Sequence, residues 1–146
     1  MKKYTVLLVD DDVDFVTSNK MALENDGFDV LTAYNRREAM EIARNTPIDT
    51  AVLDVVMETP DEGLVLAREL RKNVATRTIP LILLTSLNEV NRKAGYKIQF
   101  SDNDRDETWL PIDRYIDKPV KARDLASEIR KLLNKPFEKQ PSFGGR

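Results

Sequence analysis

A short apolar segment that ends on a carboxylate constrains this chain more than any other feature of its sequence. Residues 50–54 read TAVLD, so that apolar and β-favouring side chains run without interruption up to Asp54. Such a run, without polar alternation, is typical of a strand that is buried on both faces of a parallel sheet. Open α/β sheets bind ligands outside the carboxyl ends of their strands. We therefore expect Asp54 to lie at the ligand-binding edge of a sheet.

Three further segments repeat this pattern of an apolar run followed by polar side chains. They are TVLLV (5–9) before Asp10, Asp11 and Asp12; IPLILL (79–84) before Thr85 and Ser86; and RYID (114–117) before Lys118 and Pro119. If the four strands are parallel, several carboxylates, a hydroxyl and an ammonium group converge on one edge of the sheet.

Helical patterns separate the predicted strands. Asp12 is suited to cap a helix that runs to about Asn25, and Gly27 ends that helix. Its inner face is predicted to consist of Val13, Val16 and Leu23, with Phe15 and Ala22 beside them. Further helices are predicted after Asn35, at about 63–73, and after Pro119, with another predicted strand at 28–33. Strand and helix alternate five times, which predicts an α/β fold: a three-layer α/β/α sandwich around a five-stranded parallel sheet.

Composition excludes several classes of function. The 146 residues suit a single domain, and the net charge of −2 has no concentrated basic half, so direct binding of nucleic acid is not expected. The chain has no cysteine and no histidine, which excludes disulfides, thiolate or imidazole metal sites and a phosphohistidine on this chain. The apolar run near the N-terminus is too short for a membrane span or an export signal. We therefore expect a cytoplasmic protein without membrane contact.

The acidic side chains at the strand ends indicate a metal site. Asp10, Asp11 and Asp54 would repel one another unless a cation lay among them. Carboxylate oxygens without imidazole or thiolate favour a hard ion, Mg²⁺ or Mn²⁺ in its place. Such an ion beside a lysine and a hydroxyl suits a phosphoryl group, whose acceptor can be a carboxylate.

Taken together, these segments resemble the receiver domain of two-component response regulators, of the chemotaxis-regulator type. The resemblance rests on LLVDDD (7–12), VLD (52–54) with Met57 three residues on, LLTS (83–86) and YIDKP (115–119), and it covers residues 4–134. It implies a sheet with the flavodoxin-like strand order 2-1-3-4-5. Residues 1–134 would then form the receiver domain, and residues 135–146 would form a flexible tail.

The resemblance implies a phosphoacceptor and a set of metal ligands. Asp54 would accept a phosphoryl group from a sensor histidine kinase or a phosphotransfer protein. Asp11 would bind Mg²⁺ directly and Asp10 through water, while Asp54 and the main-chain carbonyl of Val56 would complete the protein ligands. The chain would not be an enzyme beyond its own Mg²⁺-dependent phosphorylation and dephosphorylation.

The resemblance also implies a switch. Thr85 would turn toward the acyl phosphate, Lys118 would pair with a phosphoryl oxygen, and Tyr115 would be the aromatic that moves inward with the threonine. The Lys118–Pro119 peptide bond would be cis, as it often is in this family.

Two parts of the sequence depart from the family pattern. The loop after the predicted acceptor reads METPDEG (57–63), one residue longer than usual and without proline after Met57, which leaves open whether the Val56 carbonyl keeps its place. The segment between Thr85 and Lys118 is longer than usual and carries a polar insert at about 97–112. The resemblance also implies that Val56 and Leu87 flank the attacking water. Neither side chain can hydrogen-bond to that water, which predicts a long-lived phosphoryl group.

The functional expectation is a stand-alone regulator that signals by protein contact. Phosphorylation would shift the population of conformations around the fourth helix and the insert, toward a downstream protein that the sequence does not identify. The protein would be a monomer, or a dimer linked to phosphorylation. The alternative is a pseudo-receiver that is never phosphorylated and acts as a scaffold. An aspartyl phosphatase fits poorly, because Val56 stands where a second aspartate would be needed.

Overall fold

The computed structural model describes residues 3–57, 61–85 and 112–134. Strands and helices alternate along the described chain, in the order β1 (Thr5–Val9), α1 (Val13–Asn25), β2 (Asp29–Ala33), α2 (Arg36–Asn45), β3 (Thr50–Asp54), α3 (Glu62–Lys72), β4 (Leu81–Thr85), β5 (Arg114–Asp117) and α5 (Ala122–Leu133).

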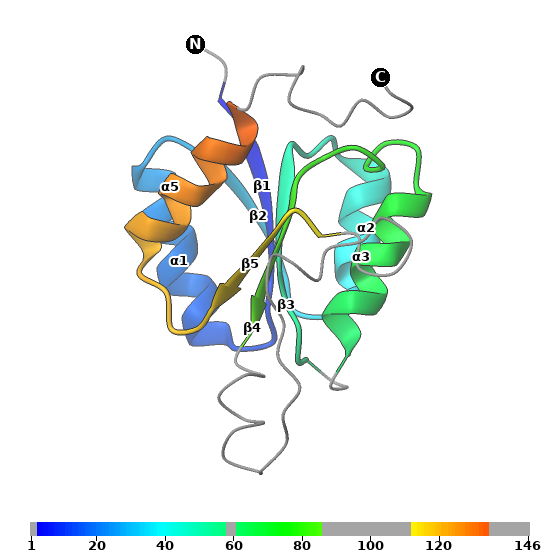
Figure 1. The fold of residues 1–146 in the computed structure, drawn as a ribbon, viewed down its shortest axis with the longest axis horizontal. Coiled ribbons are helices and arrows are strands. Elements are labelled where there is room, and N and C mark those ends of the chain that lie inside the picture. Colours follow the sequence, from blue (N-terminus) through cyan, green and yellow to red (C-terminus); the bar gives the residue numbers. More distant parts are fainter. Residues whose placement is uncertain (1–2, 58–60, 86–111, 135–146) are drawn as a thin grey trace.

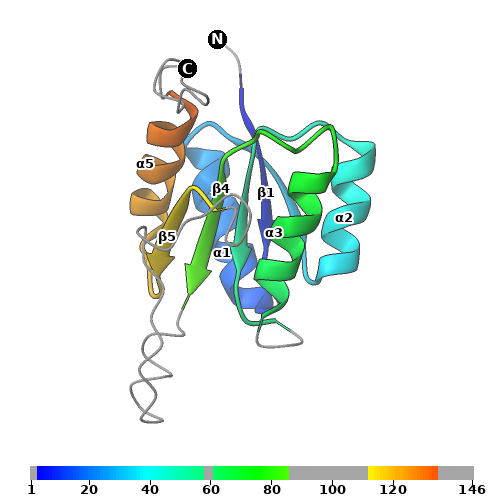
Figure 2. The ribbon, with the colours of Figure 1, turned by 45° about the vertical axis from the view of Figure 1, so that its right-hand side comes forward.

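The five strands form one parallel sheet in the order β2-β1-β3-β4-β5. Helices α1 and α5 cover one face of the sheet, and helices α2 and α3 cover the other (Figure 1). Turning the molecule brings the strands into view with α3 and α2 beside them (Figure 2). The predicted α/β class, the three layers and the strand order are all confirmed.

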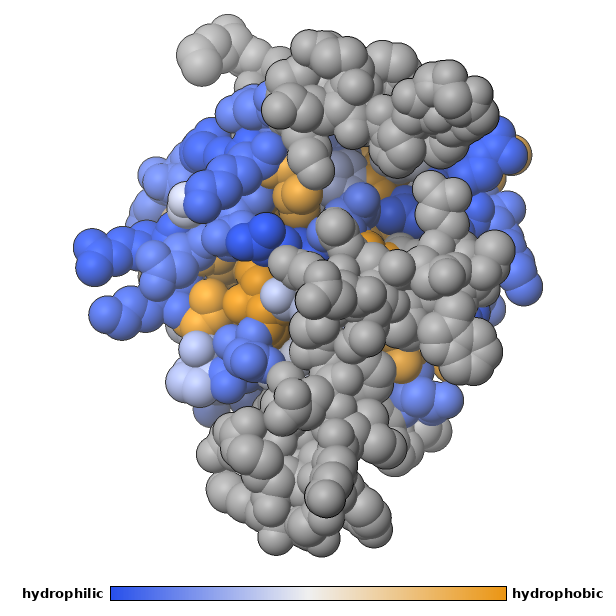
Figure 3. All heavy atoms as spheres, viewed as in Figure 1, coloured by the Kyte–Doolittle hydropathy of each residue, from blue (hydrophilic) through white to orange (hydrophobic). Residues whose placement is uncertain are grey.

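Alternate residues of each central strand enter two separate cores, because successive side chains of a strand point to opposite faces. Leu7, Leu53 and Leu83 pack under α2 and α3. Val6, Val52 and Ile82 pack under α1 and α5. Polar side chains cover much of the outer helix surfaces (Figure 3). The sheet is thus buried on both faces, as the uninterrupted apolar runs predicted.

The first helix begins where the sequence predicted, with one difference in its buried face. The Asp12 side chain accepts a hydrogen bond from the Phe15 N–H at 3.2 Å, which confirms it as the N-cap. Gly27 has a φ of 99° just beyond the helix, the left-handed conformation expected there. Val13, however, is 57% exposed, so its predicted place on the inner face was wrong. It occupies the first helical position, three residues before the buried Val16, where no earlier turn of the helix covers it.

Other boundaries shift by one or two residues. Helix α3 begins at Glu62, one residue before the predicted start, and ends at Lys72. Strand β4 begins at Leu81 because Pro80 has no N–H for the sheet, and it extends to include Thr85. The predicted flexible tail (135–146), residues 97–111 of the insert, and Leu87 lie outside the described residues. Among the described helices, none combines the length and apolarity that a membrane crossing requires.

Candidate functional site

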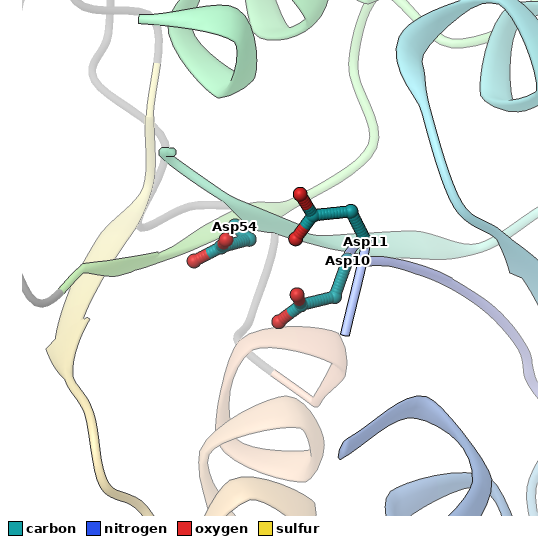
Figure 4. Close-up of side chains that lie close together, drawn as sticks. All are labelled: Asp10, Asp11 and Asp54. Carbon is teal, nitrogen blue, oxygen red and sulfur yellow. The ribbon is translucent and has the colours of Figure 1, made fainter. Parts of the chain in front are cut away.

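The carboxyl ends of β1 and β3 bring three aspartates together. Val9 of β1 is paired with Leu53 of β3, so Asp10 and Asp54 leave the sheet side by side. One carboxylate oxygen of each of Asp10, Asp11 and Asp54 lies within 4.8 Å of the others. Figure 4 shows the three side chains gathered over the ends of the two strands. The predicted convergence of acids is therefore present.

Two of these carboxylates are buried, and burial dominates their electrostatics. Asp10 is 1% exposed and Asp54 is 6% exposed, whereas Asp11 is open to solvent. Burial, with the Asp10 charge as the next cause, raises the pKa of Asp54 from its ordinary 3.8 to about 7. Burial also raises the pKa of Asp10, although a hydrogen bond from the Asp12 N–H at 3.0 Å and the Lys118 ammonium both act in the opposite direction.

Lys118, at the end of β5, supplies a positive charge between the two buried acids. Its Nζ lies 2.9 Å from Asp10 Oδ2 and 3.5 Å from Asp54 Oδ1. Burial acts to lower the pKa of Lys118, but the hydrogen bond to Asp10 and the charges of both acids outweigh it and raise that pKa. Among the described residues, the site thus holds three carboxylates and one ammonium group, which leaves an excess of negative charge.

Thr85 and Tyr115 lie on the two strands next to this cluster. Thr85 is the last residue of β4, is 1% exposed, and its carbonyl accepts a hydrogen bond from the Lys118 N–H at 2.9 Å. Tyr115 is buried in the core under α2 and α3 at 9% exposure. The Lys118–Pro119 peptide bond is cis, as predicted. The structure therefore places Thr85 beside Lys118, and it places the Tyr115 side chain inside the protein.

Gly63 lets helix α3 begin directly against the strand that carries Asp54. The Gly63 N–H donates to the Val55 carbonyl at 2.9 Å. A Cβ atom at position 63 would collide with the Asp54 carbonyl oxygen and would lie 2.8 Å from Val55 Cα. Only a residue without a side chain fits this close approach. The sequence predicts a helix that begins at about Gly63, but no local pattern indicates this packing against Asp54.

Phe15 is a second residue whose relation to the site was missed. Lys118 Nζ lies 4.5 Å from the centroid of the Phe15 ring. The apolar pattern of α1 predicts that its side chains pack inward, and it gives Phe15 no link to the acidic edge. The available signal was an aromatic residue in the first turn of a helix capped by Asp12, directly after the acids at the end of β1.

The donor set fits a magnesium ion. Asp10, Asp11 and Asp54 offer oxygen ligands only, and two of them are buried acids whose charges repel each other. A divalent cation among them would offset that repulsion and favour their ionised forms. Val56, whose carbonyl was predicted as a further ligand, follows Asp54 by two residues and is half-buried.

Comparison with known proteins identifies relatives along most of the chain. A family model described as the response regulator receiver domain matches residues 6–130. The transcriptional regulatory protein CpxR of Klebsiella pneumoniae is 31% identical over 131 residues, which span 89% of this chain and 49% of that protein. The probable transcriptional regulator ycf27 of Porphyra purpurea is 33% identical over 135 residues, which span 92% of this chain and 49% of that protein. The chain thus spans about half the length of these relatives.

Solved structures show the same architecture. A CheY-like receiver domain protein from Methanospirillum hungatei is 27% identical with a TM-score of 0.68, over 90% of this chain and 94% of that one. The signal receiver domain of a histidine kinase from Syntrophus aciditrophicus is 32% identical with a TM-score of 0.67, over 89% of each chain. CheY4 of Vibrio cholerae, at 21% identity, shares the fold with a TM-score of 0.73 over 90% and 99% of the two chains.

Proposed function

This chain belongs to the response regulator receiver domain family of two-component systems, and from that premise we propose that it is a phosphorylation-controlled switch with Asp54 as its phosphoacceptor. The observation that carries the proposal is the setting of Asp54: a buried carboxylate at a strand end, beside two further acids and 3.5 Å from Lys118 Nζ. The functional unit is proposed to be residues 1–134.

Asp54 would act as the nucleophile toward a phosphohistidine of a sensor kinase or a phosphotransfer protein. Its carboxylate oxygen forms the new bond to phosphorus while the phosphorus–nitrogen bond of the donor breaks, and the electron pair of that bond stays on the histidine nitrogen. The raised pKa of Asp54, about 7, means that the charges around it decide how much of the ionised form is present. Lys118 and a cation among the acids both favour that form.

Mg²⁺ held by Asp10, Asp11, Asp54 and the Val56 carbonyl would supply positive charge that offsets the phosphoryl oxygens. Lys118 would donate from Nζ to one of those oxygens, and the Thr85 hydroxyl, at the end of the neighbouring strand, would donate to another. These two residues already lie together, since the Lys118 N–H donates to the Thr85 carbonyl.

Signalling would follow from the change of partners at Lys118. In the structure, Lys118 Nζ is closer to Asp10, at 2.9 Å, than to Asp54, at 3.5 Å. A phosphoryl group on Asp54 would present new oxygens to this ammonium and to the Thr85 hydroxyl. The ends of β4 and β5 would respond, and Tyr115 with them, which biases the surface that a downstream protein reads.

Intact-mass spectrometry after incubation with acetyl phosphate tests the acceptor. The wild-type chain, with Mg²⁺, is expected to gain one phosphoryl adduct, and EDTA or Asp54→Ala is expected to abolish it. Asp29→Ala, which removes an exposed acid at the opposite edge of the sheet, serves as the matched control and should be phosphorylated normally. The absence of an adduct on wild-type protein under every condition would favour the scaffold reading, in which the chain is never phosphorylated.

The lifetime of the adduct is a further expectation. The Val56 side chain is apolar, and it cannot position a water molecule for attack on the acyl phosphate. Replacing it by asparagine supplies a hydrogen-bonding group at the same position, so Val56→Asn should shorten the lifetime measured by loss of the adduct over time. A wild-type half-life of only seconds would contradict this expectation.

A further inference from the structure

Four contacts close a circuit that joins the end of β1, the first turn of α1 and the end of β5. The Asp12 N–H donates to Asp10 Oδ1 at 3.0 Å, and the Phe15 N–H donates to Asp12 Oδ1 at 3.2 Å. Lys118 Nζ lies 4.5 Å from the Phe15 ring centroid and 2.9 Å from Asp10 Oδ2. The circuit thus begins and ends on the Asp10 carboxylate.

Contacts with the apolar core and with Asn19 hold Phe15 in place. Its side chain packs against the apolar core between the sheet and helices α1 and α5. Its carbonyl accepts a hydrogen bond from Asn19 Nδ2 at 2.9 Å, and Asn19 is buried one turn further along the helix. Because backbone and ring are both held, the ring offers Lys118 a contact surface in a defined place.

An aromatic ring attracts a cation without adding a formal charge. The face of the ring is the negative end of its quadrupole, and it attracts an ammonium group at this distance. This matters here because Asp10 and Asp54 already share the Lys118 ammonium, and the Asp11 carboxylate lies close to both acids. A fourth carboxylate in place of Phe15 would hold Lys118 but would increase the repulsion among the acids. An aliphatic side chain would fill the space but would not attract the ammonium.

We propose that Phe15 is a positioning residue for Lys118. Its ring holds the ammonium beside Asp10 and within reach of Asp54, so that the ammonium is in place before a phosphoryl group arrives. This inference rests on the proposed function, because it gives Phe15 a role in the reaction assigned to Asp54. It also makes a claim about the resting protein that requires no phosphorylation.

Nuclear magnetic resonance on unphosphorylated, Mg²⁺-free protein tests whether Lys118 lies against the Phe15 ring before phosphorylation. The ε-methylene protons of Lys118, assigned by comparison with Lys118→Arg, should be shifted upfield by the ring current of Phe15. The shift should persist in Phe15→Tyr and disappear in Phe15→Leu. A Lys118 side chain that moves freely away from the ring would show resonances at their ordinary positions in the wild-type protein.

The rate of phosphorylation with acetyl phosphate and Mg²⁺ tests whether Phe15 assists the reaction at Asp54. Phe15→Leu should slow phosphorylation about three- to tenfold, the range expected for a lost cation–π contact at a partly desolvated site. Phe15→Tyr should stay within about twofold of wild type, because its ring keeps a negative face. Phe15→Met is a second apolar variant should leucine pack poorly, and Met21→Leu, an exposed change on the same helix, is the control.

Two results would overturn the inference: wild-type Lys118 resonances without an upfield shift, or Phe15→Leu and Phe15→Met proteins that fold and are phosphorylated at the wild-type rate. A wild-type protein that accepts no phosphoryl group defeats the proposed function instead. In that case the ring-current shift still decides whether Lys118 stays over the Phe15 ring in the resting protein.

Discussion

The two ends of the parallel sheet both carry aspartates, but they treat them in opposite ways. At the amino end, Asp49 and Asp113 each stand one residue before a strand and bind the first residue of a neighbouring strand. At the carboxyl end, Asp10, Asp11 and Asp54 face one another. Backbone N–H groups donate to both acids of the first pair, whereas in the second group Asp10 and Asp54 share Lys118.

The amino-end aspartates use the same arrangement twice. The Asp49 carboxylate accepts from the Thr5 N–H at 2.8 Å, while its own N–H donates to the Thr5 carbonyl at 2.8 Å. The Asp113 carboxylate accepts from the Leu81 N–H at 2.8 Å, and its N–H donates to the Leu81 carbonyl at 2.9 Å. Arg71 also pairs with Asp113 at 2.8 Å. These acids satisfy backbone groups where β1 and β4 begin.

The partners of an aspartate determine whether it stabilises or destabilises the fold. An aspartate that accepts from a backbone amide replaces its lost water with a protein donor. A buried aspartate beside another acid loses water and gains repulsion, and the raised pKa of Asp54 records that cost. The carboxyl edge is therefore electrostatically unfavourable by itself and is suited to a ligand that brings positive charge. Five predictions set the two edges against each other.

Replacing the acid at the carboxyl edge should stabilise the protein. Asp54→Asn keeps the shape of the side chain and removes a buried charge, so at pH 7 without metal the free energy of unfolding should rise by about 2–4 kcal/mol. Urea unfolding in EDTA measures this. A loss of stability in the variant would contradict the surplus of negative charge at this edge.

The raised pKa of Asp54 also makes the free energy of unfolding depend on pH. Because the pKa of Asp54 is about 7 in the folded protein and about 3.8 when unfolded, the folded state binds more protons between those values. The contribution of this group to stability therefore falls as pH rises from about 4 to about 7. The difference between wild type and Asp54→Asn should shrink toward zero near pH 4.

Replacing an acid at the amino edge should have the opposite sign. Asp113→Ala leaves the Leu81 N–H and the Arg71 guanidinium without this acceptor, and should lower the free energy of unfolding by about 2 kcal/mol. Asp29→Ala, at the same edge, removes only an exposed ion pair with Lys3 and should cost less than about 0.5 kcal/mol. Equal losses in both variants would contradict a special role for the Asp113 contacts.

Magnesium should act on the carboxyl edge alone. At ten times its dissociation constant, Mg²⁺ should raise the free energy of unfolding of wild-type protein by about 1.4 kcal/mol. Asp113→Ala should gain the same amount from the ion, whereas Asp11→Asn should gain little. Thermal unfolding with and without EDTA provides the comparison. A gain that survives Asp11→Asn unchanged would place the ion elsewhere.

Of the two aspartates that accept from a backbone N–H, the smaller effect is expected where the substitution keeps the hydrogen bond. Asp49→Asn retains a side-chain oxygen for the Thr5 N–H and loses only the charge, so stability should fall by about 0.5–1 kcal/mol. Asp49→Ala removes the acceptor and should cost more than the asparagine variant. Urea unfolding of the two variants side by side measures the difference, and equal losses would show that the charge matters more than the acceptor.

Much of the site could be predicted because it depends on where strands end. Uninterrupted apolar runs located β1, β3 and β4, and the parallel order then placed Asp10, Asp54 and Thr85 on a common edge. The caps were also local, since Asp12 and Asn35 each accept from a backbone N–H three residues on. Glu38 differs from a complete capping box, because its carboxylate accepts from the Tyr34 N–H instead of the Asn35 N–H.

The contacts that were missed join residues that are distant in sequence. Phe15 meets Lys118 across more than one hundred positions, and Asp113 meets Leu81 across thirty-two. Gly63 fits against Asp54 only because helix α3 starts so close to the end of β3. Periodicity and capping rules describe neighbours within one or two turns, so they carry no information on such pairs.

By itself, the sequence determined the alternation of strands and helices, the buried sheet and the identity of the edge where the acids gather, because each follows from side-chain pattern and strand direction. The tertiary structure alone decided that Asp10 is the nearer partner of Lys118, that Phe15 lies against the same ammonium, and that Asp54 titrates near 7. These properties depend on distance and burial, which arise only when remote segments pack and water leaves the space between them.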